Sequence, residues 1–386
     1  MIKRRHFLAA PALAAGAQTP ARRGRPRVAC ILNTYFPNSH ADVFMGRLLF
    51  GYRLNGKSYQ PAVDVASLYV DQFPVNDMAR EQAEEYGVTI YPSIAGAMRL
   101  GGSKIAVDGV AIIGEHGNYP RTPRGNIMYP RWKFFDQATT VMREDGRVVP
   151  LFNDKYFAYE WGDAEKMYRR VKEMRIPFMC GSTLPLTWRR PPLQFPGGVQ
   201  LEELLAVSFS DIEEHGYHAI ELMQAMAERR GGGETGVEAV RCVEGEEVWE
   251  LARRGDWSRD LMEAALSRRV NPPPDKQRFP LAAIQVKYRD GLKGTVLNLD
   301  GQARDYLFAA REKGRAEPHS SCFYIQLYNH NHWGFMVRDF EDLVLSGRPA
   351  NLMERTYLST GILLYALESR LQGQKWISTP QLAIRY

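Results

Sequence analysis

The sequence RVACIL, residues 27–32, is a short apolar run that is typical of a buried strand in a parallel sheet. Similar runs follow it along the chain, and stretches with helical spacing of apolar residues separate them. We expect strands at 62–70, 88–91, 109–113, 148–152 and 176–179, and helices at 41–54, 77–86, 94–100 and 164–174. Strands that alternate with helices predict a Rossmann-like, doubly wound parallel sheet, here an α/β domain over residues 27–180.

The pattern changes after residue 180. A Pro-rich stretch leads into longer alternating runs at 201–209, 237–248, 281–288, 293–299 and 322–327. A helix interrupts these runs between Ser210 and Arg230, and a capping box of Ser210 and Glu213 is expected to open it. Two helices, at 335–346 and 353–372, close the chain. We therefore expect residues 181–386 to form an α+β domain with an open antiparallel sheet.

The N-terminus has the pattern of an export signal. Residues 3–5 are Lys-Arg-Arg, a short Ala-rich run follows, and residues 15–17 (AGA) offer a small-residue cleavage site. This pattern predicts a twin-arginine signal peptide and linker over residues 1–26, and hence a periplasmic or exported protein. The alternative is a disordered basic tail. No later segment reaches the roughly 18 apolar residues that a membrane-spanning helix needs.

The distribution of charge argues against nucleic acid as a partner. The formal net charge is +6, but three basic residues lie at 3–5 and three more at 22–25. Without them the rest of the chain is near neutral, so no broad basic face is expected. A small-molecule ligand is the partner that the rest of the sequence favours.

The four cysteines are widely spaced and contain no CxxC pair. They are Cys30, Cys180, Cys242 and Cys322. Because Cys30 and Cys180 fall in apolar, strand-like runs, we expect buried free thiols. Disulfides remain the alternative in an oxidising compartment.

Two neighbouring strands of the expected parallel sheet end in polar residues. The first strand end is followed by Glu115, His116, Asn118, Tyr119 and Arg121, and the second by Asn153, Asp154 and Lys155. Ligands of such sheets bind outside the carboxyl ends of the strands, so these groups are expected to meet in one crevice. Carboxylates, amides and imidazoles suit the hydroxyl groups of a sugar. The alternative is that both segments are solvated loop tips.

The helix that begins near residue 210 offers a third polar group. Asp211, His215 and His218 share one of its faces, and these residue types could bind a divalent metal. A capped helix end with ordinary charges is the alternative. His330 and His332 alternate as two metal ligands on a strand would, although such a run is more often a polar turn. Trp188 could stack on a sugar ring, or belong to a plain connector.

These parts, in this order, resemble the glucose-fructose oxidoreductase and inositol dehydrogenase family (Gfo/Idh/MocA). The motifs that carry the resemblance are DGVAII at 108–113, IPFM at 176–179, HGYHAIE at 215–221 and SGRP at 346–349. The resemblance implies an oxidoreductase of sugars or polyols that uses NAD or NADP. It also implies that His218 lies beside the reacting hydroxyl group, and that the open sheet face of the second domain forms a homo-oligomer.

The cofactor motifs depart from the family pattern. The turn after the first strand, residues 33–39, contains no glycine, although the family's turn needs glycines to approach a pyrophosphate. Asn33 and Thr34 fall at cofactor-binding positions of this turn. The family's Glu-Lys-Pro falls on residues 181–183, which places Ser182 at the cofactor and removes the family's lysine. Lys155 is a candidate substitute for that lysine.

Three functions remain open at this point. The first is the redox enzyme that the resemblance implies, with a tightly bound NAD or NADP. The second is a non-redox enzyme on the same scaffold, such as a metal-assisted lyase, isomerase or hydrolase, with Glu115, His116, Asp154 and His218 as acid, base or ligands. The third is an inert binding protein of the envelope.

Overall fold

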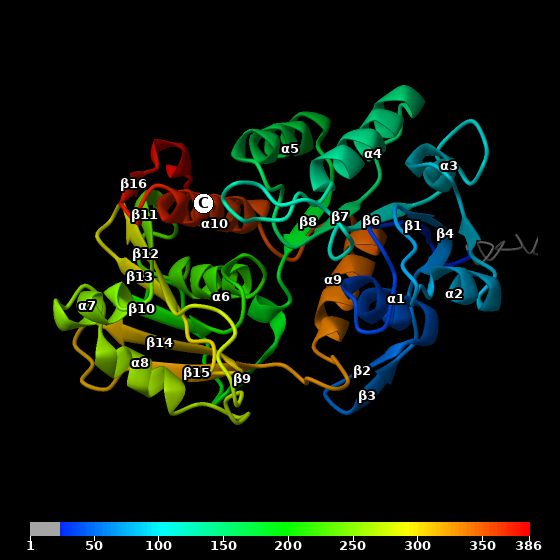
Figure 1. The fold of residues 1–386 in the computed structure, drawn as a ribbon. Coiled ribbons are helices and arrows are strands. Elements are labelled where there is room, and N and C mark those ends of the chain that lie inside the picture. The colour runs from blue at the N-terminus through cyan, green and yellow to red at the C-terminus, as the bar shows by residue number, and fades with distance from the viewer. Residues whose placement is uncertain (1–23) are drawn as a thin grey trace, which may run out of the picture.

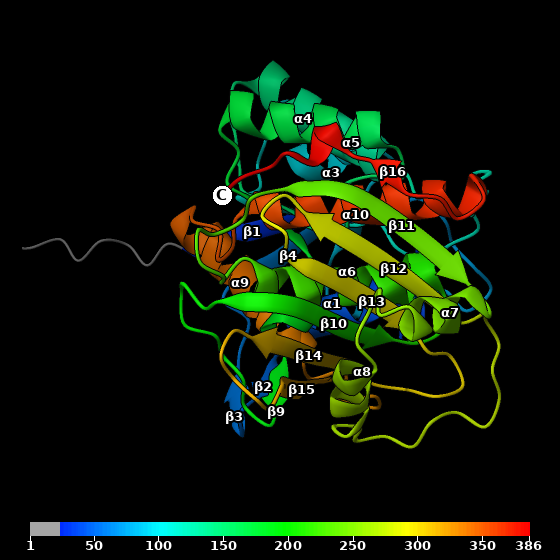
Figure 2. The same ribbon diagram turned by 90° about the vertical axis from the view of Figure 1, so that its left-hand side faces the viewer.

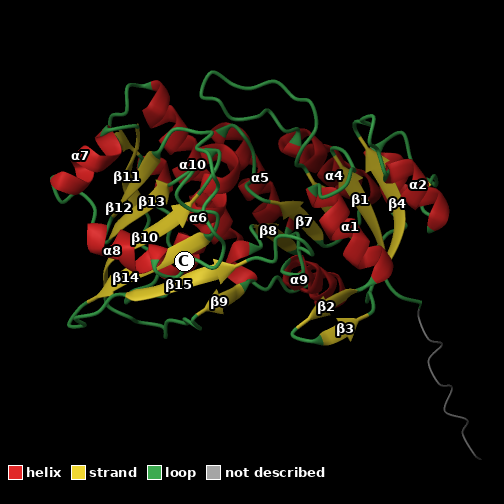
Figure 3. Cartoon of the chain, turned by 60° about the horizontal axis from the view of Figure 1, so that its bottom comes forward, coloured by secondary structure: helices red, strands yellow, loops and turns green. Residues whose placement is uncertain are grey.

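The computed structural model describes residues 24–386, so the predicted leader lies almost entirely outside the described residues. Two sheets lie side by side, each with helices packed against it (Figure 1; Figure 3). The first sheet has six strands in the order β5-β4-β1-β6-β7-β8, and every neighbouring pair is parallel. Its strands are β1 (Arg27–Leu32), β4 (Asp64–Val70), β5 (Thr89–Ile90), β6 (Gly109–Ile113), β7 (Leu151–Asp154) and β8 (Phe178–Gly181). The predicted Rossmann-like sheet is confirmed.

Helices cover both faces of this sheet because both faces of its strands are apolar. One face packs on α1 (His40–Phe50) and α2 (Ala79–Glu85), and a short hairpin of β2 (Tyr52–Leu54) and β3 (Lys57–Tyr59) follows α1. The other face packs on α3 (Ile94–Arg99), α4 (Arg131–Asp145) and α5 (Trp161–Met174). The sequence pattern missed α4, whose amphipathic stretch follows the long polar loop after β6.

The second sheet has eight strands in the order β16-β11-β12-β13-β10-β14-β15-β9 (Figure 2). Only the pair β10–β13 is parallel, so the expected antiparallel sheet is in fact mixed and mostly antiparallel. The strands are β9 (Trp188–Arg190), β10 (Leu201–Ser208), β11 (Val237–Glu244), β12 (Ala282–Tyr288), β13 (Lys293–Asn298), β14 (Tyr306–Glu312), β15 (His319–Tyr324) and β16 (Ile377–Ser378).

Both faces of the second sheet carry helices as well. One face packs on α6 (Tyr217–Ala227) and α10 (Met353–Leu371), which form the largest apolar core of the chain. The other face packs on α7 (Glu247–Arg253) and α8 (Arg259–Leu266) around the buried Trp257. The expected homo-oligomer needs an open sheet face, and α7 and α8 cover much of this one.

Helix α9 (Trp333–Ser346) crosses the predicted boundary between the domains. It comes late in the chain but lies beside α1 in the first core, where Met336, Phe340 and Leu343 are buried (Figure 1). The chain therefore leaves the second sheet after β15 and returns to the first. The segment that makes this return, residues 325–332, passes between the two sheets.

The helix expected from Ser210 begins differently. Asp211, not Ser210, caps it: the Asp211 carboxylate accepts from the backbone N–H groups of Glu213 and Glu214 at 2.8 and 3.2 Å. Ser210 has a φ of 63°, outside the helix. The first turn, Ile212–Gly216, is a π-helix that runs directly into α6.

Two simpler expectations are met within residues 24–386. All four cysteines are free, and Cys30, Cys242 and Cys322 are buried in the cores. A search of the described helices for one both long and apolar enough to cross a membrane finds none. Short 3₁₀ turns at Leu184–Leu186 and Pro380–Leu382 complete the structure.

Candidate active site

A cavity of about 210 Å³ lies between the two sheets, at the carboxyl ends of β6 and β7. This is where parallel sheets bind their ligands. Residues from α1, α6, β14 and the returning segment 325–332 also line it. Six of the chain's eight histidines are in this lining: His40, His116, His215, His218, His330 and His332. Each of the three polar groups predicted from the sequence thus contributes at least one residue to this cavity.

A buried ion cluster forms the floor of the cavity. Both oxygens of Glu115 are paired: Oε1 accepts from the Arg131 guanidinium, and Oε2 lies 3.2 Å from Nζ of Lys155. Burial alone would raise the pKa of Glu115, but the charges of Lys155 and Arg131 outweigh it and lower the pKa to about 2. Glu115 is therefore ionised at any physiological pH.

Backbone strain accompanies two of the cavity residues. Lys155 and His116 follow β7 and β6, with φ angles of 62° and 63°. The left-handed conformation costs a residue with a side chain roughly 1–2 kcal/mol, and such strain persists where the surrounding structure requires it. Here it directs Nζ of Lys155 toward Glu115 and toward the backbone oxygen of Glu214, at 3.4 Å.

Three of the histidines use Nδ1 for a hydrogen bond to a protein group. The Nδ1 atoms of His40, His215 and His218 lie 2.6, 2.7 and 2.6 Å from Asp154 Oδ2, Tyr306 OH and Ser182 Oγ, respectively. Within residues 24–386 their Nε2 atoms have no hydrogen-bond partner. Burial lowers the pKa of His215 to about 4 and that of His218 well below its usual range. Both rings are therefore neutral near pH 7, and such a ring whose Nδ1 donates offers Nε2 as an acceptor.

Glu214 and His40 are site residues that the sequence pattern did not single out. Glu214 lies one helical turn before His218 and lines the cavity, and burial raises the pKa of its carboxyl group. Glu214 lies four positions before His218, and this spacing could have predicted that the two residues share a helix face. His40 is the first residue of α1, which follows β1, and this position near the carboxyl end of a parallel strand could have predicted a site residue.

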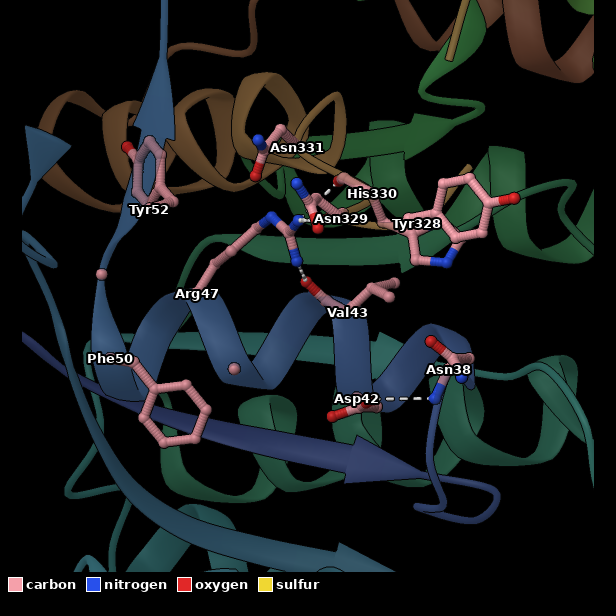
Figure 4. Close-up of a pocket in the computed structure, with 12 residues that line it drawn as sticks. Asn38, Asp42, Val43, Arg47, Phe50, Tyr52, Tyr328, Asn329, His330 and Asn331 are labelled. Carbon is pink, nitrogen blue, oxygen red and sulfur yellow. Dashed lines mark hydrogen bonds between the residues drawn. The ribbon is translucent and has the colours of Figure 1, made fainter. Parts of the chain in front are cut away.

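Arg47 fixes the returning segment that carries His330 and His332 (Figure 4). This arginine on α1 is buried, and its guanidinium donates to the backbone oxygens of Asn329 and His330, at 2.9 and 2.5 Å. The two histidines lie in a loop and not on a strand, with ring centroids 6.0 Å apart. Nδ1 of His332 is buried and has no hydrogen-bond partner among the described residues.

Several predicted ligand-binding residues do not line the cavity. The loop after β6 folds toward β4, so Asn118 pairs with Gln72 and Tyr119 with Asp71. Arg121 donates to the backbone of its own loop. The structure therefore does not bring these three residues to the cavity, because the direction of a loop tip cannot be inferred from its composition.

Three further site predictions are corrected for different reasons. Asn153 is fully buried inside β7, where its amide donates to the Tyr156 backbone oxygen at 3.2 Å. Trp188 lies on the edge strand β9, and its Nε1 donates to Asn55 at 2.7 Å. Asp211 caps the helix through Oδ1, and among the described residues it does not form a metal-ligand group with His215 and His218.

The crevice that would hold a dinucleotide is filled by the chain itself. The Asn33 amide donates to the His116 backbone oxygen at 3.1 Å, which bridges the ends of β1 and β6. Thr34 is buried beside it. At the start of α1, the Ser39 hydroxyl caps the helix by accepting from the Asp42 N–H. The Asp42 carboxylate in turn accepts from the Asn38 N–H at 2.8 Å (Figure 4). Several donors of this turn are thus in use, although the Thr34 hydroxyl is buried without a partner among the described residues. The turn also has no glycine to let a pyrophosphate approach its backbone, so the residues present do not fit a dinucleotide in the ordinary position.

Ser182 has a different neighbour from the one expected. It follows β8, and its hydroxyl contacts His218 and accepts from the Leu184 N–H at 3.0 Å. Lys155, the candidate substitute for the family's lysine, lies at the end of β7 and lines the cavity.

Comparisons with known proteins show the fold. No family model and no curated protein matches the sequence. Among solved structures, a probable dehydrogenase from Thermotoga maritima aligns with a TM-score of 0.58 at 12% identity, covering 92% of this chain and 99% of that one. Scyllo-inositol dehydrogenase from Lactobacillus casei aligns with a TM-score of 0.59 at 8% identity, covering 92% of this chain and 98% of that one. An oxidoreductase from Agrobacterium radiobacter was solved with NAD+, L-tartaric acid and magnesium. It aligns with a TM-score of 0.55 at 14% identity, covering 92% of this chain and 98% of that one.

Proposed function

We propose that this chain is a divergent enzyme of the Gfo/Idh/MocA type that acts on a sugar or polyol derivative bound between its two sheets. The likeness in fold to inositol and sugar dehydrogenases supports the substrate class. One observation carries the proposal: Lys155 from the first sheet and His218 from the second domain line the same cavity. At about 210 Å³ the cavity is below the roughly 300–1,000 Å³ of drug-sized ligand sites, which favours a small substrate.

The residues of the cavity support proton transfer at a substrate hydroxyl group. His218 is neutral, and with Nδ1 on Ser182 its Nε2 accepts the proton of the hydroxyl. The Lys155 ammonium donates to the oxygen and stabilises the negative charge that develops on it. Glu115, itself paired with Arg131, holds this ammonium in place. General base catalysis of this kind contributes about 10²–10⁴-fold to a rate.

Two reaction classes begin with this step. The fold likeness favours oxidation with NAD or NADP, as in the dehydrogenases that share the fold. The filled crevice favours the second class, a non-redox lyase, isomerase or hydrolase reaction that needs no dinucleotide. An inert binding protein is the outcome if no reaction occurs.

A turnover screen separates these outcomes. The purified chain is incubated with a library of hexoses, uronic acids, inositols and their phosphates, with and without NAD+ or NADP+, and the products are followed by mass spectrometry. Loss of two hydrogens from the substrate indicates oxidation, and loss of water indicates elimination. A product of unchanged mass with a new retention time indicates isomerisation.

Variants connect turnover to the cavity. We expect Lys155→Ala and His218→Ala to slow the reaction by about 10²–10⁴-fold. His319→Ala is the matched control, because His319 pairs with Glu312 on the second sheet, outside the cavity. Consumption of no compound, or equal turnover in all variants, would overturn the proposal.

The predicted export remains part of this proposal. The pattern of residues 1–26 supports twin-arginine transport of the folded chain into the periplasm. Mass spectrometry of chain recovered from periplasm tests it, with a mature N-terminus after residue 17 as the expected result. An unprocessed chain confined to the cytoplasm would contradict it.

A further inference from the structure

Three cavity residues form a metal-ligand geometry, and the proposed reaction gives a role to only one of them, Glu115. His40, Glu115 and His116 each offer one ligand atom, and these atoms all lie within 4.8 Å of one another. They come from the start of α1 and the end of β6. Two imidazoles and one carboxylate are a common donor set for divalent transition ions, with positions left open for water or substrate.

The ring positions suit a shared ion. The ring centroids of His40 and His116 are 5.3 Å apart. Two imidazoles bound to one tetrahedral ion through bonds of about 2.0–2.1 Å have centroids roughly 5 Å apart. The spacing of the two rings therefore matches that of two imidazoles on one ion, and binding would draw the ligand atoms closer than their present separation of up to 4.8 Å.

The surroundings of His40 match those of a metal ligand. Its Nδ1 is held by the buried carboxylate of Asp154, and its Nε2 has no hydrogen-bond partner within residues 24–386. Metal-binding histidines characteristically hydrogen-bond a carboxylate through the nitrogen that does not bind the ion, which fixes the ring and raises its basicity.

The ring of His116 supplies a second, independent observation. Its Nε2 is buried and has no hydrogen-bond partner in the described part of the chain. An unsatisfied buried polar atom costs about 1–3 kcal/mol, and an ion at this place would satisfy it. The left-handed backbone of His116 holds the ring in this position.

Glu115 is available through one of its two oxygens. Oε1 stays with Arg131, whereas Oε2 faces Lys155. In the metal-free chain the Lys155 ammonium is the cation beside Oε2, and an ion would compete with it there. Arg131 keeps the carboxylate ionised and oriented in either state.

We propose that His40, His116 and Glu115 bind one divalent transition ion of the Zn²⁺ class, with Asp154 as a positioning residue for His40. The binding of the ion does not depend on any substrate. Its role rests on the proposed function: an open position would face the substrate hydroxyl near His218 and make it more acidic.

Metal content tests the assignment directly. Chain stripped with a chelator is dialysed against micromolar Zn²⁺ alone, and bound zinc is measured by inductively coupled plasma mass spectrometry. We expect about one ion per chain. Loss of a ligand in His40→Ala or His116→Ala should abolish this stoichiometry, and Asp154→Asn should weaken binding about 10–100-fold. His319→Ala should bind zinc as the unchanged chain does.

Cobalt gives a readout that does not depend on turnover. The visible absorption of Co²⁺-loaded chain reports imidazole coordination, and we expect His116→Ala to lose it while its melting curve shows that it is folded. The assignment is overturned if the unchanged chain binds no ion, or if His40→Ala and His116→Ala keep it while His332→Ala loses it. Turnover that survives complete metal removal overturns the role of the ion but leaves the proposed function intact. Bound zinc without turnover of any compound overturns the proposed function but leaves the metal site intact.

Discussion

The hydroxyl group of Tyr119 donates a hydrogen bond to the Asp71 carboxylate at 2.8 Å. Asp71 follows β4, and Tyr119 lies in the loop after β6, so the bond crosses the carboxyl edge of the first sheet. Tyr69 donates to the other oxygen of Asp71, also at 2.8 Å. In dinucleotide-binding folds an acidic residue beyond the first turn binds the ribose hydroxyls. Here each oxygen of the Asp71 carboxylate already accepts a hydrogen bond from a tyrosine of the chain.

The first prediction concerns dinucleotides. NAD+ and NADP+ should leave the melting temperature of the chain unchanged, because a dinucleotide would have to displace the bonds of Asp71, Asp42 and Asn33. A ligand present at 100 times its Kd stabilises a protein by about 2.7 kcal/mol, so binding would be easy to detect in a thermal melt. A concentration-dependent rise of the melting temperature would contradict the filled crevice.

The second prediction concerns Arg131, which is fully buried against Glu115. In Arg131→Met, Lys155 is the one remaining cationic partner of the buried Glu115 carboxylate within residues 24–386. We therefore expect the free energy of unfolding, measured by urea titration, to fall by about 3 kcal/mol. Arg253→Met, which removes an exposed partner of Glu250, is the control and should change it by less than about 1 kcal/mol. Equal effects of the two substitutions would show that the ion cluster is not buried.

The third prediction concerns the end of β8. Gly181 has a φ of 121°, and a Cβ there would contact the Glu221 carboxylate and lie 2.8 Å from Thr356 Oγ1. We expect Gly181→Ala to cost about 2–4 kcal/mol of stability. Gly162→Ala, in the first turn of α5 where a Cβ meets no atom within 4 Å, should be neutral or stabilising by up to about 1 kcal/mol. A neutral Gly181→Ala would contradict this packing.

The fourth prediction concerns the pH dependence of stability. Burial raises the pKa of Glu221 to about 7 from an ordinary value of 4.5. Between these values the folded chain binds more protons than the unfolded chain, so this group lowers stability as the pH rises through this window. Glu221→Gln resembles the protonated form and removes the linkage.

Urea titrations at pH 5 and pH 8 measure this effect. Relative to Glu221→Gln, the unchanged chain should lose about 2–3 kcal/mol of stability between the two pH values. Parallel stability curves for the two proteins would show that Glu221 is not a proton-binding site of the folded chain.

The periodicity of the sequence was enough to predict the first sheet and its helices α1, α2, α3 and α5, but not α4. Apolar runs such as 27–32 and 109–113 are typical of buried parallel strands, and polar residues at the carboxyl ends of such strands lie at one sheet edge. This is why Glu115, His116 and Lys155 could be placed in one crevice before any coordinates. The position of His218 followed from the helix that carries it.

The rest depends on contacts between residues far apart in the chain. No local pattern shows that α9 returns to the first sheet, and this return brings His330 and His332 to the cavity. The direction of the loop after β6 is set by Gln72 and Asp71, which lie more than 40 positions before it. For the same reason Asn118, Tyr119 and Arg121 could not be separated from Glu115 and His116 by composition.

A double-mutant cycle of Lys155→Ala and His218→Ala tests the central claim most directly. Its readout is the affinity of the chain, measured by calorimetry, for the tightest-binding compound of the sugar and polyol library. If both side chains contact one ligand, the double variant should depart from the sum of the single variants by about 1 kcal/mol or more. Strict additivity, within about 0.3–0.5 kcal/mol, would contradict a single site shared by the two domains.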